Sequence, residues 1–213
     1  MFPIALFIII ITIAISYKGI EDKNFFEKYK FNISMIKTRK EYIRVLSSGF
    51  LHADFIHLFF NMLSLYLFQG IVVFFFGNFG FISIYLGSLL LGNLLSFYIY
   101  RNRYWYSAVG ASGAVSGIIF SAIAVAPNEI EINFLPGWIF GTLYFGYSVY
   151  MMLYPKQWDN TGHSAHLGGA IFGLIFVAVH SPLAFITNWP YLTAMSLPLG
   201  YMAYRIFIKK DKF

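Results

Sequence analysis

Residues 51–100 read LHADFIHLFFNMLSLYLFQGIVVFFFGNFGFISIYLGSLLLGNLLSFYIY, and Asp54 is the only charged side chain among them. A helix needs about 20 mostly apolar residues to cross the hydrocarbon core of a bilayer, so this stretch is long enough for two crossings. Phe76–Gly80, with the sequence FGNFG, combines two glycines and an asparagine and so indicates a tight turn. We therefore predict membrane spans at residues 51–75 and 80–100.

Charged side chains are almost as rare in the rest of the chain. Asp, Glu, Lys and Arg make up 11% of the 213 residues, whereas about a quarter of a typical soluble domain is charged. This composition excludes a soluble enzyme, a disordered chain, a small disulfide scaffold and an outer-membrane barrel with its alternating strands. The uncharged blocks predict further spans at residues 2–17, 108–126, 136–154, 164–180 and 184–208.

The predicted fold class is an all-α, polytopic membrane helix bundle. We expect a single membrane-embedded domain over residues 1–213, because the sequence has no internal repeat and no low-complexity tract. The last apolar region is interrupted by Asn188, Pro190 and Pro198 but is long enough to form a seventh span. The first span has no Lys or Arg before it and no small-x-small cleavage site after it, so we interpret it as a retained span rather than a signal peptide.

The basic residues are concentrated in one loop. The formal net charge is +6, and eight of the 15 Lys and Arg residues lie in residues 18–44, mixed with aromatic side chains. That mixture is typical of a segment at a membrane interface, so we prefer attraction to the anionic headgroups of the lipid bilayer over binding to nucleic acid. The absence of cysteine excludes disulfides, thiolate metal sites and a cysteine nucleophile.

Polar residues inside the predicted spans are the candidates for chemistry, because such side chains are costly in a membrane. His57 and Asn61 are four residues apart at the start of the second span, Ser112 is near the start of the fourth, and His166 is near the start of the sixth. These three spans run in the same direction, so their N-terminal ends lie on one side of the membrane. The topology therefore predicts that a hydroxyl, two imidazoles and an amide gather at one depth.

Glycine spacing favours close packing of the fourth and sixth spans. Gly113 and Gly117 in one, and Gly169 and Gly173 in the other, form faces of the small-xxx-small type, which allow helix backbones to approach. We expect this packing to bring the Ser112 hydroxyl within hydrogen-bonding reach of the His166 imidazole.

The chemistry that this arrangement favours is acyl transfer. His166 would remove the proton of Ser112 and later protonate the leaving amine. No acidic residue lies within the fourth or sixth span, so we expect a Ser-His dyad rather than a triad. Asn61, His57 and the Ser112 N–H are candidate donors to the oxyanion.

Less specific interpretations exist for each residue taken alone. A serine in a membrane helix often donates to the carbonyl four residues earlier, and a membrane histidine often forms only a helix–helix hydrogen bond. Ser116 is interpreted as packing. An all-histidine metal site of His52, His57, His163 and His166 is disfavoured, because there is no His-Glu-x-x-His motif and no carboxylate inside a span beyond Asp54 at the start of the second. We predict no metal and no cofactor.

The ordered set of motifs resembles the rhomboid family of intramembrane serine proteases. The resemblance covers roughly residues 40–180. The matching residues are Arg44 with Phe50-Leu51-His52, His57-x-x-x-Asn61, Gly110-x-Ser112-Gly113, and Ala165-His166-x-x-Gly169-x-x-x-Gly173.

The resemblance implies a function and roles for residues. The protein would cleave transmembrane protein substrates near the membrane surface, without a cofactor, with Ser112 as nucleophile and His166 as base. His57, Asn61 and Gly110, with the Ser112 N–H, would form the oxyanion hole. The supporting residues would be His52, Arg44, Gly113, Gly169 and Gly173, and the substrate gate on the fifth span would contain Trp138, Phe140 and Tyr144.

Three positions depart from the family pattern. Ile43 precedes Arg44 where the family often has tryptophan. Ser116 occupies the position, four residues after the serine, where the family commonly has an aromatic ring that stacks on the histidine. Phe120 stands where the family often has glycine. The residue that orients His166 is therefore an open question at the level of sequence.

Two criteria for membrane orientation disagree. With seven spans, all 15 Lys and Arg residues fall on the side of the candidate site, which the positive-inside rule assigns to the cytoplasm. The family resemblance implies the opposite. Following the family, we predict a multi-pass protein of a bacterial inner (plasma) membrane, with the active site opening to the extracytoplasmic side.

Two other functions compete with proteolysis. A catalytically inactive rhomboid-like protein would bind membrane proteins for sorting or degradation, but such relatives typically lose the serine or the histidine, and both are present here. A small transporter would require broken helices and charged residues within spans. The second to sixth spans show no helix break, and their only charged residue is Asp54, at the start of the second.

Overall fold

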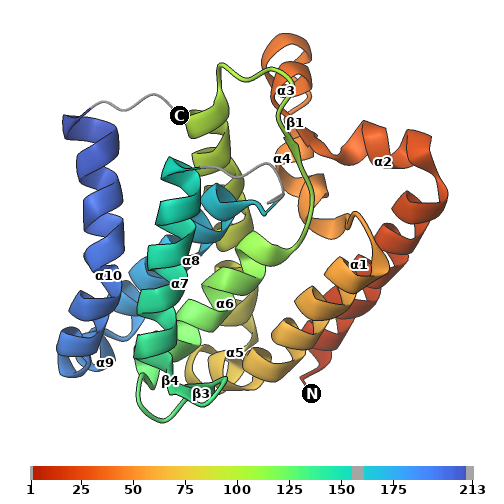
Figure 1. Ribbon diagram of the computed structural model, residues 1–213. Helices are drawn as coiled ribbons and strands as arrows, with labels where there is room; N and C mark the ends of the chain where they lie inside the picture. The colour runs from red at the N-terminus through yellow and green to blue at the C-terminus, as the bar shows by residue number, and fades with distance from the viewer. Residues whose placement is uncertain (1, 155–160, 210–213) are drawn as a thin grey trace.

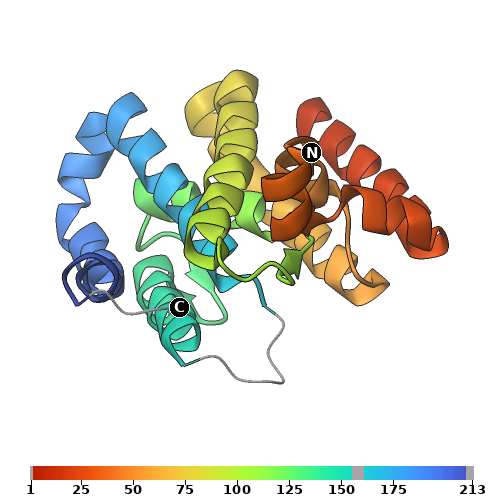
Figure 2. The ribbon, with the colours of Figure 1, turned by 90° about the horizontal axis from the view of Figure 1, so that it is seen from above.

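A computed structural model describes residues 2–154 and 161–209 of the chain as an all-α bundle (Figure 1). The long helices are α1 (Pro3–Glu21), α5 (Phe55–Tyr100), α6 (Ser112–Val125), α7 (Gly137–Leu153), α8 (His163–His180) and α10 (Trp189–Ala203). Viewed from above, α1 and α10 lie at opposite edges of the bundle (Figure 2). The fold class predicted from the sequence is confirmed.

Short elements cover the two ends of the bundle (Figure 1). At the upper end are α2 (Lys23–Tyr29), α3 (Ile33–Arg39), α4 (Ile43–Ser47) and the 3-10 turn η1 (Ser48–Phe50). At the lower end are the strand pair β3 (Glu131–Ile132) and β4 (Leu135–Pro136), and α9 (Pro182–Thr187). A second antiparallel pair, β1 (Phe31–Asn32) with β2 (Ser107–Ala108), joins the first loop to the segment before α6.

The helix α5 is a hairpin rather than a single rod. Its 46 residues would extend about 69 Å if straight, yet residues from both of its ends, His57 and Tyr100, line the same cavity. The reversal occurs at Gly77, whose φ of 66° and ψ of −177° are essentially restricted to glycine. The predicted turn over Phe76–Gly80 is therefore reduced to one non-helical residue.

The distribution of side chains is that of a protein in lipid. Within residues 2–154 and 161–209, three helices, α1, α5 and α8, are long and apolar enough to cross a membrane. Large apolar side chains on α5, such as Phe59, Phe74 and Phe79, are exposed, whereas its polar residues Gln69 and Asn93 are buried. Because lipid does not compete for hydrogen bonds, polar groups are directed into the bundle and apolar groups outward.

The helix α8 lies backbone to backbone between α6 and the second half of α5. A Cβ added at Gly169 would lie 1.9 Å from the Gly113 carbonyl oxygen, and one at Gly173 would lie 2.4 Å from that of Gly117. On its other side, a Cβ at Gly92 of α5 would lie 2.5 Å from the Ala165 carbonyl oxygen. The close approach expected from the small-xxx-small faces is present in the structure.

Several predicted spans differ from the helices in their ends. The first helix continues to Glu21 instead of ending at residue 17, and α6 starts at Ser112 instead of residue 108. The second was predicted from residue 51, but residues 51–54 are not helical and α5 starts at Phe55, after Asp54 accepts a hydrogen bond from the His57 N–H at 2.7 Å. The last, 184–208, is broken at Asn188, whose amide donates to the Ala124 and Val125 carbonyls at 3.1 and 3.3 Å. It continues as α10 and the π-helical turn η2 (Tyr204–Ile208).

Candidate active site

Ser112 is the first residue of α6, and the loop before it is shaped by a glycine. Gly110 has a φ of 127°, which L side chains rarely adopt. A Cβ there would lie 2.7 Å from His57 Cε1 and 3.7 Å from Ser112 Oγ. The Gly110 N–H donates to the Ser48 carbonyl at 3.0 Å. Glycine therefore allows the loop, the His57 ring and the Ser112 hydroxyl to lie next to each other.

His52 holds the next residue of the loop. The Ala111 N–H donates to His52 Nε2 at 3.2 Å, so the ring proton is on Nδ1, which lies 2.8 Å from Ser16 Oγ. Ser16 in turn donates to the Phe50 carbonyl at 2.9 Å. Burial, reinforced by the neighbouring His57, lowers the pKa of His52 to about 3, against the opposing effect of Asp54. The neutral ring links α1, the segment before α5 and the start of α6.

The residues next to Ser112 and His166 in the chain are in contact. A Cβ added at Gly113 would lie 3.2 Å from the carbonyl oxygen of Ala165. Each candidate catalytic residue is therefore one position away from the point where α6 and α8 meet. Among the described residues, no hydrogen bond joins Ser112 directly to His166, and their predicted pairing stays a prediction.

An aromatic ring from α7 lies on His166. The Tyr144 and His166 rings are stacked, with centroids 6.0 Å apart and planes inclined by 24°. The Tyr144 hydroxyl lies 3.0 Å from Ser116 Oγ on α6. Ser116, interpreted from the sequence as packing, is therefore a hydrogen-bonding partner of the ring that contacts the candidate base.

The proposed oxyanion donors are on α5 and α6. The His57 ring lies edge-on to His52 at 4.9 Å. The buried Asn61 donates one amide N–H to the His57 carbonyl at 3.0 Å, which leaves the second for another acceptor. The Ser112 N–H is at the N-terminus of α6, where backbone donors have no intrahelical acceptor and the helix dipole favours negative charge. These groups could stabilise an oxyanion.

The helix α6 is shorter than the hydrocarbon core, so Ser112 at its start lies below one membrane surface when its other end is at the opposite surface. Fourteen residues extend about 21 Å, less than the roughly 30 Å of the hydrocarbon core. A cavity of 720 Å³ opens at this end of the bundle, and neither Ser112 nor His166 is in its lining. Its walls come from five segments and include Asp54, His57, Arg103, Ser107, Met152 and His163. This open cavity, lined by both polar and apolar side chains, is a route by which water could approach the site.

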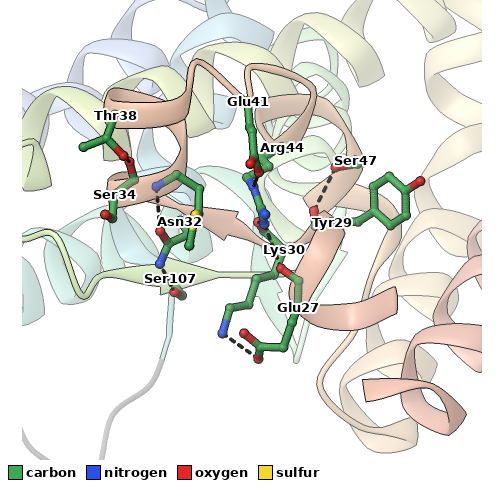
Figure 3. A network of polar contacts seen from close by, with 11 residues as sticks. Glu27, Tyr29, Lys30, Asn32, Ser34, Thr38, Glu41, Arg44, Ser47 and Ser107 are labelled. Carbon is green, nitrogen blue, oxygen red and sulfur yellow. Dashed lines mark hydrogen bonds and ion pairs between the residues drawn. The ribbon is translucent and has the colours of Figure 1, made fainter. Parts of the chain in front are cut away.

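Arg44 is a structural residue of the first loop (Figure 3). Its buried guanidinium donates from Nε to the Glu41 carboxylate at 2.6 Å, and from Nη1 to the Glu27 and Lys30 carbonyls at 2.8 and 2.9 Å. Ser47 adds a hydrogen bond to the Tyr29 carbonyl at 2.8 Å. Arg44 thus satisfies carbonyls at the C-terminal end of α2 and fastens α2 to α4.

The residues predicted to form a gate have different surroundings. Trp138 packs against Tyr191 of α10, with ring centroids 5.8 Å apart. Phe140 contacts Tyr144 at 5.9 Å, and Tyr144 faces the candidate site. The helix α7 packs chiefly against α10.

Among the described residues, no three histidine or acidic side chains are grouped so that they could hold a metal ion.

Ser16 is a residue that the sequence analysis did not single out. Its hydroxyl is buried and bonds to His52, which is 36 residues away in the chain. A serine inside an apolar span is a signal that could have drawn attention to it. Its partner could not be inferred, because no local spacing connects the first span to the segment before α5.

Known proteins share this chain's sequence pattern. A family model described as the Rhomboid domain matches residues 39–183. The chain is 27% identical over 158 residues to Rhomboid protein 1, mitochondrial, of Saccharomyces cerevisiae. The aligned region covers 71% of this chain and 45% of that protein. It is 30% identical over 139 residues to Presenilin-associated rhomboid-like protein, mitochondrial, of Mus musculus, with 62% and 37% covered. It is also 30% identical over 152 residues to Rhomboid-like protein 11, chloroplastic, of Arabidopsis thaliana, with 62% and 50% covered. The chain thus spans half or less of the length of these relatives.

These relatives correct one prediction. The expected location was a bacterial inner membrane, with the site on its extracytoplasmic side. Two of the relatives are mitochondrial by name and the third is chloroplastic, so the bacterial assignment is wrong. The prediction of a multi-pass membrane protein agrees with the structure, in which α1, α5 and α8 are each long and apolar enough to cross a membrane.

Proposed function

Because the chain belongs to the rhomboid family, we propose that it is an intramembrane serine protease that cleaves transmembrane proteins near the membrane surface. Ser112 is the nucleophile and His166 is the general base. The observation that carries this proposal is the contact between Gly113 and Ala165, since it joins α6 and α8 at the residues adjacent to Ser112 and His166. The protein acts as one domain, whose catalytic part corresponds to the region that matches the family.

The reaction divides into acylation and hydrolysis. Ser112 Oγ attacks the peptide carbonyl carbon while His166 takes the hydroxyl proton. The resulting oxyanion accepts hydrogen bonds from the Ser112 N–H and from Asn61 or His57. The C–N bond breaks as His166 returns the proton to the leaving amine, and water, activated by His166, then releases the acyl group from Ser112. The cavity that His57 lines is a source for this water.

The mitochondrial relatives support a location in a eukaryotic organelle membrane. The substrate class, membrane proteins with a transmembrane helix, is supported by the family and by the depth of Ser112.

The experiment that tests the proposed function is labelling of the detergent-purified protein with a fluorescent fluorophosphonate, which reacts with activated serines. We expect the wild type to be labelled and the Ser112→Ala and His166→Ala variants to be unlabelled. Ser121→Ala, which removes another buried hydroxyl of α6, is the matched control and should retain labelling.

A second assay follows cleavage of a transmembrane fusion protein in vesicles. Cleavage by Ser112→Ala at the wild-type rate would remove Ser112 from its role. A folded wild type that neither labels nor cleaves would favour the inactive, membrane-protein-binding relative instead.

A further inference from the structure

We propose that Tyr144 is the positioning residue for His166, acting from α7 through its ring and anchored to α6 by Ser116. The inference rests on the proposed function, because it assigns the residue that keeps the general base in its working orientation. It gives a role to Ser116, which the proposed mechanism does not use. It also identifies the residue that orients His166 when position 116 carries a serine instead of an aromatic ring.

A base of this kind needs a fixed ring. An imidazole must direct one nitrogen at the serine hydroxyl, and rotation about its Cβ–Cγ bond would turn that nitrogen away. Position 116, on the same face of α6 as Ser112 and one turn later, carries a hydroxyl instead of a ring. The stacked ring on His166 comes from Tyr144, at a centroid distance of 6.0 Å, within the range of attractive aromatic pairs.

Tyr144 is itself held from several directions. Its hydroxyl is 3.0 Å from Ser116 Oγ, and its ring contacts Phe120 of α6 at 5.5 Å and Phe140 of α7 at 5.9 Å. Phe120 is fully buried and stacks on Phe145 at 4.3 Å, with planes inclined by 19°. A ring fixed by a hydrogen bond at one end and by packed aromatics beside it can restrict the His166 ring.

The same arrangement accounts for two sequence departures together. Because serine is small, Ser116 leaves free the space that an aromatic ring on α6 would fill, and its hydroxyl is hydrogen-bonded to the hydroxyl of Tyr144 on α7. Phe120, four residues later, packs against that ring. On another side of His166 the His163 ring lies edge-on at 6.1 Å, so aromatic rings from α7 and from the preceding turn of α8 both border the base.

The test measures the rate of fluorophosphonate labelling of Ser112 against probe concentration, which separates the maximal rate from the half-saturating concentration. The full-length protein is compared with Tyr144→Ser, with Tyr144→Leu, and with the exchange variant Ser116→Tyr/Tyr144→Ser, which moves the ring to α6 at nearly constant volume. Tyr150→Leu is the control, since Tyr150 is a half-exposed tyrosine of α7 whose ring contacts Tyr154, with the two rings tilted by 43°.

We expect Tyr144→Ser to lower the maximal rate about 10- to 100-fold, the size of effect that a displaced catalytic group produces. The half-saturating concentration should stay within about twofold, because the probe binds without the ring. The exchange variant should recover most of the lost rate, because it returns an aromatic ring to the neighbourhood of His166. Tyr150→Leu should label like the wild type.

Two results would overturn the proposal while leaving the proposed function intact. One is labelling of folded Tyr144→Ser at the wild-type maximal rate. The other is a loss that the exchange variant, folded as judged by its melting temperature, does not recover. If Tyr144→Ser does not fold, Tyr144→Leu decides, because it fills much of the same space without an aromatic ring. A maximal rate lowered by about tenfold or more supports the proposal, and the wild-type maximal rate contradicts it. Failure of the wild type to label at Ser112 would instead reject the proposed function itself.

Discussion

At the scale of single residues, the His52 side chain joins two segments that are far apart in the sequence. It bonds to Ser16, 36 residues before it, and to the N–H of Ala111, 59 residues after it. The bond from Ala111 requires a neutral ring with its proton on Nδ1, because protonated Nε2 could not accept from the Ala111 N–H. The start of α6, and with it Ser112, therefore depends on the protonation state of a residue outside the dyad.

This dependence predicts how stability changes with pH. The folded protein resists protonation of His52 until the pH nears 3, whereas an unfolded chain takes up the proton near 6.5. The unfolded state thus binds more protons over this window, and the free energy of unfolding falls as pH drops below 6.5, by up to about 1.4 kcal/mol per pH unit. Above pH 6.5 the contribution is fully present.

The measurement compares the pH dependence of unfolding in detergent for the wild type and His52→Gln, whose amide can accept and donate but does not titrate. We expect the variant to lose less stability than the wild type between pH 7 and pH 5. Parallel pH profiles for the two proteins would show that His52 is not the group responsible.

At the scale of helices, the contact of α6 with α8 decides where the two candidate catalytic residues meet. The glycine spacing in the sequence predicted that these helices would approach closely, and their backbones do so at Gly113–Gly169 and Gly117–Gly173. Two backbones can come this near only where no Cβ intervenes, since even one methyl group at Gly169 would overlap the Gly113 carbonyl.

Replacement of Gly169 by alanine should therefore separate the helices and misplace His166. We expect a destabilisation of about 1–3 kcal/mol, typical of overpacking, and a loss of fluorophosphonate labelling on the order of 100-fold. The control is Gly70→Ala in α5, where an added Cβ meets nothing within 4 Å. Equal labelling of the two variants would mean that the Gly113–Gly169 contact does not position the site.

At the scale of the whole molecule, the hairpin of α5 sets which ends of the helices share a side. The first loop, the loop 101–111 and the candidate site lie at one end, and the tip of α5 at Gly77 lies at the other. Because the chain has no cysteine, single cysteines can report this topology without background.

We expect Lys23→Cys and Asn102→Cys to react with a membrane-impermeant maleimide in vesicles of one orientation, and Asn78→Cys to react only in vesicles of the opposite orientation. All three residues are exposed. Reaction of positions 23 and 78 from the same side would contradict the hairpin. The result also identifies the compartment that the candidate site faces.

The ends of the helices could be predicted to within about four residues, apart from the break in the last region, because absence of charge over about 20 residues is a direct requirement of the hydrocarbon core. The candidate residues could be grouped by topology alone, since alternate spans share a direction. Neither argument specifies the rotation of a helix about its axis. Three contacts depend on that rotation and could not be predicted. They are the stack of Tyr144 on His166, the hydrogen bond between Ser116 and Tyr144, and the hydrogen bond between Ser16 and His52.

The sequence by itself determined that this chain is a membrane helix bundle and which residues share one end of it, because hydropathy and chain direction are properties of local composition and order. The tertiary structure alone decided which aromatic ring stacks on His166 and which ring nitrogen of His52 carries the proton. It also decided that Arg44 bonds to carbonyls of the first loop. These outcomes follow from packing among segments tens of residues apart, where a change of a few ångströms makes or removes a hydrogen bond.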